Sequence, residues 1–171
     1  MKKTDISQLA REDAFNLIGK EWMLVTAGTL EHYNTMTASW GGIGWLWNKP
    51  VAFVFIRPER FTHQFIEENE RMTLSFLGEA HRDILNFCGS KSGRDHDKAK
   101  ETGLQPVKTE LGCVAFQQAR LTLEGRKLYK SAFKAENFLD KAALERWYND
   151  KPGGSLHDVY VVEIENVYTT E

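Results

Sequence analysis

The sequence predicts a mainly β protein, an antiparallel barrel that is closed or nearly closed and carries short peripheral helices. At least six segments rich in β-branched and aromatic residues follow one another at short intervals, and each is bounded by Gly, Pro or Asn. Only brief stretches between them have the apolar spacing of a helix. Closure into a barrel removes the unpaired edges that an open sheet would leave exposed.

The elements of this barrel follow from the local patterns. Strands are expected over residues 22–28, 36–41, 51–57, 72–78, 113–125 and 159–168. Amphipathic helices are expected over residues 6–18, 60–70, 79–89 and 139–150. Gly89 is placed to end the third of these helices. The alternating stretch 114–133 is long for a single strand, which predicts a hairpin or a bend near Gly125.

The length and composition fit one domain with a substantial core. The chain has 171 residues, of which 42% are hydrophobic and 27% charged, enough to bury roughly two-thirds of the unfolded surface. We therefore expect a single domain over residues 1–171. A formal net charge of −2 gives no global field that would attract polyanions, so neither nucleic acid nor a membrane surface is an expected partner.

The expected location is the cytoplasm. The N-terminal MKKTDISQLARED has two lysines but no apolar run behind them, and no window approaches the roughly 20 apolar residues of a membrane span. Cys88 and Cys113 lack CxxC spacing, which predicts two reduced thiols. The five histidines show no metal-ligand spacing, so no metal is expected.

Two glycine-containing segments resemble nucleotide-binding motifs only in part. The ribbon NTMTASWGGIG (34–44) contains a G-x-G, but Trp47 stands where a dinucleotide fingerprint needs its third glycine, and no helix is expected there. In CGSKSGRDHDK (88–98), Lys91 precedes Gly93, which is the wrong order for a P-loop. Both signatures are rejected.

The segment 88–98 nevertheless suits a phosphate. Gly89 and Gly93 allow positive φ angles, which can aim consecutive backbone N–H groups into one concavity. Further donors and positive charge come from Ser90, Lys91, Ser92, Arg94 and Lys98. A basic surface loop balanced by Asp95 and Asp97 explains the same residues equally well.

A second cationic site follows the expected strand 51–57. Arg57 ends that strand, Pro58 prevents its continuation, and Arg60 and Thr62 stand where the next helix begins. Helix N-termini offer unpaired N–H donors, so the arginine pair predicts an anion site. Ion pairs with neighbouring glutamates are at least as common an explanation.

The ribbon between these sites suits a flat aromatic ligand. In an extended MTASW segment, Met36, Ala38 and Trp40 point to one side, and Thr37 and Ser39 point to the other. One face is then apolar and the other carries hydroxyl groups. A heterocycle with a phosphate tail could use both faces and the distant cations, whereas an ordinary core strand is the competing interpretation.

Three segments occur in one order: NTMTASWGGIG, WNKPVAFVFIRPERFTHQFI and CGSKSGRDHDKAKETGL. An LVTAG strand precedes them, and an H-x-x-Y-V-x-E-I motif follows, made of His157, Tyr160, Val161, Glu163 and Ile164. Together they closely resemble the flavoredoxin-like branch of the flavin reductase family, whose members are FMN-binding split-barrel proteins. The resemblance extends from about Trp22 to Val167.

The resemblance implies an FMN site. The residues implied to line the flavin are Asn34, Met36, Thr37, Ala38, Ser39 and Trp40. Those implied to surround the ribityl phosphate are Arg57, Arg60, Thr62, Ser90, Lys91, Ser92, Gly93 and Lys98. His157 matches the C-terminal motif and is a candidate catalytic residue, which could orient a nicotinamide or stabilise reduced flavin. A structural hydrogen bond is an equal alternative for it.

Two positions depart from the family pattern. Val162 stands where relatives commonly have glycine, and His63 stands where an aromatic residue is frequent. Val162 could narrow the space beside the flavin or only adjust the packing of the barrel. Neither change affects the FMN site itself.

The function that the resemblance implies is that of an FMN-containing oxidoreductase, which accepts hydride from NAD(P)H and passes electrons to another acceptor. The flavin supplies the chemistry, so no catalytic dyad is required. Relatives are dimeric, so a homodimer is expected, and its contact area could include Trp45, Trp47, Phe53 and Phe55 unless the core buries them. The alternative is a non-catalytic FMN-binding electron carrier or flavin-storage module. A split barrel that binds haem, or serves only for interaction, is more remote.

Overall fold

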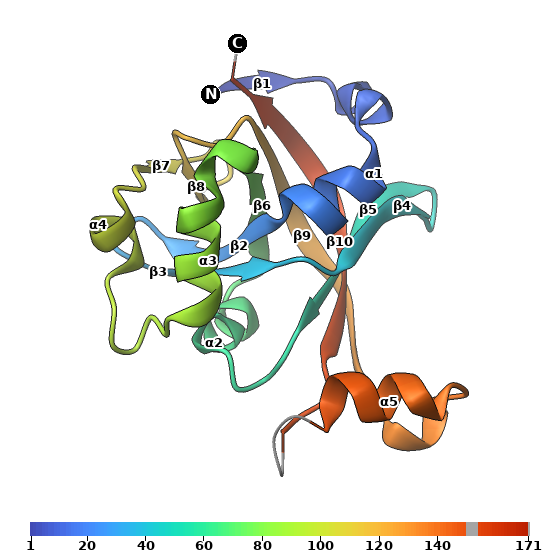
Figure 1. The fold of residues 1–171 in the computed structure, drawn as a ribbon. Coiled ribbons are helices and arrows are strands. Elements are labelled where there is room, and N and C mark those ends of the chain that lie inside the picture. The colour runs from blue at the N-terminus through green and yellow to red at the C-terminus, as the bar shows by residue number, and fades with distance from the viewer. Residues whose placement is uncertain (150–153, 171) are drawn as a thin grey trace.

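The computed structural model describes residues 1–149 and 154–170, and most of its strands form one large antiparallel sheet (Figure 1). These strands are β1 (Lys2–Thr4), β2 (Met23–Thr29), β3 (His32–Ala38), β4 (Gly41–Leu46), β5 (Lys49–Ile56), β6 (Arg71–Phe76), β9 (Leu121–Ala132) and β10 (Asp158–Thr169). Their order is β3-β2-β6-β9-β10-β5-β4, and β1 pairs with the end of β10. A separate pair consists of β7 (Pro106–Lys108) and β8 (Val114–Phe116). The predicted mainly β, antiparallel fold is confirmed.

The large sheet wraps around one apolar core. Buried side chains reach this core from both halves of the sheet, including Val25, Met36, Val54, Leu74, Leu123 and Tyr160. β3 and β4 are the two ends of the strand order, and they are joined in sequence by Ser39 and Trp40. The barrel is therefore split between these two strands, beside the glycine-rich ribbon.

Short helices decorate the barrel. They are α1 (Ala14–Asn16), α2 (Phe61–Glu68), α3 (Arg82–Ser90), α4 (Lys98–Thr102) and α5 (Lys141–Tyr148), with the 3-10 turns η1 (Ile6–Arg11), η3 (Glu79–His81) and η4 (Ala135–Asn137) and the π-helical turn η2 (Leu17–Glu21). α5 lies at the far end of the long β9 and β10 strands, at the bottom of Figure 1. None of the helices in the described residues is long and apolar enough to cross a membrane.

The predicted single helix over residues 6–18 is wrong. Asp5 accepts a hydrogen bond from the backbone N–H of Ser7 and begins η1, and Asp13 accepts from Phe15 and Asn16 and begins α1. Two N-caps therefore start two short helices where the apolar spacing alone suggested one. The predicted helix over 139–150 is observed as α5, and residue 150 lies outside the described residues.

Two predicted strands are also divided. The segment 36–41 contains the end of β3 and the start of β4, and the segment 113–125 contains β8 and the start of β9. Gly125 forms no hairpin, because β9 continues through it, but the pairing of β9 with β10 changes register next to Gly125. A Cβ atom there would lie 2.7 Å from Val162 Cγ1. Val162 is thus a buried core residue packed against a glycine, which supports barrel packing as its role.

Candidate functional site

Two adjoining cavities meet at Arg60 beside the split in the barrel. The first, which we call the aromatic cavity, has a volume of about 190 Å³ and is lined by Met36, Thr37, Ala38, Ser39, Trp40, Phe55, Arg57, Arg60 and His157. The second, the cationic cavity, has a volume of about 260 Å³ and is lined by Asn34, Glu59, Arg60, Phe61, Thr62, Gly89, Ser90, Lys91, Ser92, Gly93, Arg94 and Lys98. Every residue predicted to contact FMN, together with His157, lines at least one of these two cavities.

Lys98 places a buried positive charge in the cationic cavity. Its side chain is only 5% exposed, and its Nζ donates to the carbonyl oxygens of Thr35, at 2.8 Å, and Cys88, at 2.9 Å. No carboxylate of residues 1–149 or 154–170 pairs with it. Burial lowers the pKa of Lys98 to about 8, and the nearby Arg60 acts in the same direction. A bound anion would supply the missing negative charge.

Arg60 and the first turn of α2 complete the wall of the cationic cavity. Burial lowers the pKa of Arg60, and Arg57 adds to this effect while Glu59 opposes it. The buried hydroxyl of Thr62 accepts a hydrogen bond of 2.8 Å from Asn34 Nδ2, so its own hydrogen is left to donate. Backbone N–H groups at a helix N-terminus favour negative charge. The cavity therefore has the donor set of a phosphate site.

Gly89 and Gly93 serve a different purpose from the predicted one. Neither adopts a positive φ, and α3 continues through Gly89 to Ser90, so the predicted helix stop is wrong. A Cβ atom at Gly89 would lie 3.3 Å from Thr37 Cβ, and one at Gly93 would lie 2.0 Å from Asn34 Oδ1. A side chain at Gly93 would require its neighbours to move, and one at Gly89 would be tight, because the loop and α3 pack directly against β3.

The predicted flat apolar face of the ribbon is wrong in part. Met36 is buried in the barrel core, so its side chain offers no surface to a ligand. The Thr37 hydroxyl donates a hydrogen bond of 2.5 Å to the carbonyl oxygen of Leu85. These two residues can meet a ligand mainly through their backbone, whereas Trp40 is 41% exposed and lies edge-on to Trp147 at 5.3 Å between ring centroids.

Arg57 lies in the aromatic cavity and does not line the cationic cavity, where the phosphate was expected. Its Nη2 donates to the carbonyl oxygen of Trp147 at 2.6 Å, and its Cζ lies 5.1 Å from the ring centroid of Tyr148. Arg57 thereby fixes the end of α5 beside the cavity.

His157 is buried at the edge of the aromatic cavity. Its Nδ1 lies 2.7 Å from the hydroxyl of Tyr148, and its ring centroid lies 5.4 Å from that of Trp40. Burial lowers the pKa of His157 to about 4, and Arg57 adds to this effect. The imidazole is therefore neutral near pH 7 in the protein alone, and a neutral imidazole acts on its neighbours through hydrogen bonds.

Sequence reasoning missed several residues of the site. Phe55, Glu59 and Phe61 line the two cavities and were not predicted to do so, whereas Gly89 and Arg94 line the cationic cavity as parts of the segment 88–98 that was interpreted as suited to a phosphate. Trp147 and Tyr148 were also missed, because α5 reads as an ordinary amphipathic helix. The C-terminal end of α5 contacts the ribbon only because α5 lies between the long strands β9 and β10 in the chain.

A cluster of potential metal ligands lies on the other face of α2. His63, Glu67 and Asp158 bring ligand atoms within 4.8 Å of one another. Lys130 Nζ lies 2.9 Å from Glu67 and 3.2 Å from Asp158, and His63 Nε2 lies 2.8 Å from Asp158. The ammonium group already supplies the positive charge, so the cluster forms an ion-pair network that joins α2 to β9 and β10.

Known structures share this fold. An FMN-binding protein from Thermus thermophilus is 23% identical, with a TM-score of 0.67 over 86% of this chain and 69% of its own. A flavoredoxin from Methanosarcina acetivorans is 20% identical, with a TM-score of 0.69 over 88% and 69%. An NADH:FAD oxidoreductase from Streptomyces globisporus is 14% identical, with a TM-score of 0.64 over 88% and 75%.

The sequence comparisons agree with the fold. No curated protein matches the chain in sequence. The profile of the flavin reductase like domain matches residues 15–171, which is nearly the whole chain. The protein therefore belongs to the flavin reductase-like family.

Proposed function

We propose that this protein binds FMN across the two cavities and is an oxidoreductase that accepts hydride from NAD(P)H and passes electrons to a second acceptor. The observation that carries the proposal is the buried, carboxylate-free ammonium of Lys98 in a cavity that adjoins an aromatic one. A phosphate-bearing ring compound satisfies both halves of this site.

The residues present fit that cofactor. Lys98, Arg60 and Thr62 would hold the phosphate together with the N-terminus of α2. Trp40 and the backbone of residues 36–39 would flank the ring. Bound FMN would supply the hydride-accepting chemistry, which removes the need for a proton-transfer dyad in the chain.

The use of NAD(P)H is supported by the family and by the similar fold of an NADH:FAD oxidoreductase. The second candidate is a flavin-binding electron carrier, favoured by the equally similar fold of a flavoredoxin. Steady-state oxidation of NADH and NADPH by the FMN-loaded protein separates the two. Turnover with a chemical acceptor supports the oxidoreductase, and its absence with full FMN occupancy supports the carrier. A cytoplasmic location stays a prediction from the sequence.

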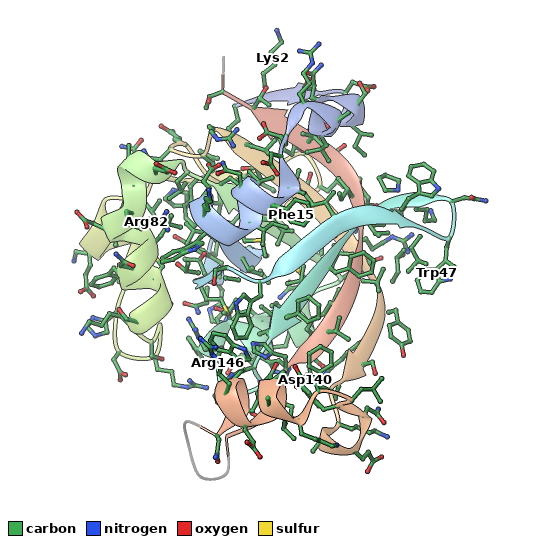
Figure 2. The ribbon with its side chains drawn as sticks, turned by 45° about the vertical axis from the view of Figure 1, so that its right-hand side comes forward. Lys2, Phe15, Trp47, Arg82, Asp140 and Arg146 are labelled. Atoms are coloured by element: carbon green, nitrogen blue, oxygen red, sulfur yellow. The ribbon has the colours of Figure 1, made fainter. Side chains whose placement is uncertain are left out.

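We also propose a homodimer in solution. Trp45 and Trp47 are 68% and 57% exposed, which removes core burial as the explanation for them. Figure 2 shows Trp47 at the tip of the β4 and β5 hairpin, where its exposed ring meets that of Tyr129 on β9 edge to face. Exposed aromatic side chains are enriched at protein interfaces. Sedimentation at micromolar concentration tests this, and a monomeric mass would contradict it.

The first experiment for the FMN site is a visible absorption spectrum of the protein purified without added cofactor. Flavin bands, or saturable binding when FMN is titrated, are the expected result. Lys98→Met tests the phosphate contact, and Lys100→Met on the exposed side of the same helix is its matched control. Failure of the unmodified protein to bind any flavin would overturn the proposal.

A further inference from the structure

Tyr148 makes an unexplained contact at the edge of the aromatic cavity. Its hydroxyl lies 2.7 Å from His157 Nδ1, and the two rings meet edge to face with centroids 5.5 Å apart. Arg57 holds the same end of α5 through the Trp147 carbonyl oxygen. Figure 2 shows α5, marked by Asp140 and Arg146, below the ends of the long strands. The contact with His157 is therefore made by an anchored helix end.

The direction of this hydrogen bond can be assigned from the neighbouring groups. Burial raises the pKa of Tyr148, so the phenol keeps its proton, and the imidazole of His157 is neutral for the reason given above. If Nδ1 carried the imidazole hydrogen, the phenol hydrogen would have to be donated to solvent, because the residues that the structure describes provide no other acceptor for it. The phenol hydrogen stays within the protein only if the phenol donates to Nδ1, which leaves the imidazole hydrogen on Nε2.

We propose that Tyr148 is a positioning residue that fixes His157 as the Nε2–H tautomer, so that His157 presents a neutral hydrogen-bond donor to an acceptor atom of the bound ring. The second half of this proposal rests on the proposed function, because it requires a ring compound in the aromatic cavity. His157 lines that cavity, and with Nδ1 turned to Tyr148, Nε2 is the ring nitrogen left for a ligand.

The charges that line the aromatic cavity favour a neutral hydrogen-bond donor over a further cation. Arg57 and Arg60 already line it with two guanidinium groups. A third positive charge would be repelled by them, whereas an N–H group adds a directed hydrogen bond without net charge. A flavin ring offers carbonyl oxygens as acceptors for such a donor. Reduction changes the electron density on these oxygens and therefore the strength of the hydrogen bond, so the bond would also affect the reduction potential.

The tautomer is tested without any flavin. Long-range ¹H–¹⁵N correlation spectra of the ¹⁵N-labelled apoprotein report which nitrogen of His157 carries the hydrogen. We expect the Nε2–H pattern in the unmodified protein and a mixture of tautomers in Tyr148→Phe, while the control Tyr129→Phe changes nothing. The Nδ1–H pattern in the unmodified protein, or no change in a folded Tyr148→Phe variant, would overturn the assignment.

The ligand half is tested with bound FMN and riboflavin. Tyr148→Phe is expected to weaken both flavins equally, by about three- to tenfold, and to shift the visible absorption band and the midpoint potential. His157→Gln, which keeps an N–H donor, should retain more affinity than His157→Leu. Unchanged affinity, spectrum and potential in Tyr148→Phe would overturn this half. Complete absence of flavin binding to the unmodified protein would overturn the proposed function as well, and the tautomer result would still stand.

Discussion

Glu124 and Lys98 are both buried charged residues, and their surroundings differ. Glu124 is fully buried, yet its Oε2 accepts hydrogen bonds from Tyr168, at 2.7 Å, and Asn166, at 2.9 Å, and its Oε1 accepts one from Thr109. Burial alone would raise the pKa of Glu124, but the hydrogen bonds from these three residues outweigh it and lower the pKa. Hydrogen bonds from the chain itself therefore stabilise the buried carboxylate of Glu124.

Lys98 has no comparable compensation. Two backbone carbonyl oxygens accept from its ammonium, and its pKa still falls to about 8. A buried charge whose desolvation is not compensated destabilises the folded protein, so it is unfavourable for a purely structural residue. The same charge favours the binding of an anion. Neither residue has a counter-charge within the described residues, but the hydrogen bonds of the chain offset burial for Glu124 and do not offset it for Lys98. The difference teaches that burial of a charge does not by itself mark a functional site; burial that the hydrogen bonds of the chain leave uncompensated does.

The largest expected effect is a loss of stability without a loss of flavin affinity, caused by a substitution at Glu124. Glu124→Gln replaces an accepting oxygen by an amide group that faces the donors of Asn166, Tyr168 or Thr109. We expect the free energy of unfolding to fall by about 3 kcal/mol in urea denaturation, with unchanged flavin affinity of the folded protein. Glu110→Gln, in an exposed pair with Lys3, is the control and should cost at most about 1 kcal/mol. A selective loss of FMN affinity in Glu124→Gln would break the comparison.

The next effect is the reverse, a loss of binding without a loss of stability. Lys98→Met should raise the Kd for FMN about 100-fold, or about 2.7 kcal/mol, because a charged hydrogen bond to the phosphate disappears. Riboflavin has no phosphate, so its Kd should change by less than about threefold. The apoprotein should be at least as stable as before at pH 7. Equal losses for both flavins in isothermal titration would remove Lys98 from the phosphate site.

The pKa of Lys98 gives a smaller, pH-dependent effect. The pKa near 8 in the apoprotein must rise when a phosphate binds, so binding takes up a proton above that pH. We expect the Kd for FMN to be constant between pH 7 and about 8, and to increase by up to about tenfold for each further pH unit. The Lys98→Met variant should show a flat profile over the same range. A flat profile in the unmodified protein would mean that Lys98 keeps its charge without the ligand.

The fold was largely predictable because it depends on local patterns. Segments rich in β-branched and aromatic residues predicted the long strands, the need to remove sheet edges predicted their closure, and the family resemblance implied a split barrel. The predicted element boundaries were wrong where individual residues interrupt a segment whose apolar periodicity continues. Asp13 restarts a helix, and Ser39 and Trp40 separate two strands that the sequence joins.

The site was predictable as a set of residues, and less so as a geometry. The ribbon and the loop at 88–98 carried enough motif to place their residues around two cavities. Which side chains point outward depends on packing, so Met36 was assigned to the ligand although it fills the core. The contact of Tyr148 with His157 joins two elements whose relative position no local pattern encodes.

The smallest expected effect distinguishes the two cavities from each other. Trp40→Ala removes an exposed aromatic wall of the cavity in which the ring is proposed to bind, so FMN and riboflavin should both weaken by about fivefold, close to 1 kcal/mol. The same truncation at Phe15, which is exposed and lines neither cavity, should leave both affinities unchanged. Since Lys98→Met is expected to act on FMN alone, the double variant should lose the product of the two factors for FMN and only the Trp40 factor for riboflavin. A Trp40→Ala effect confined to FMN would place Trp40 at the phosphate end, and the assignment of ring and tail to the two cavities would then have to be exchanged.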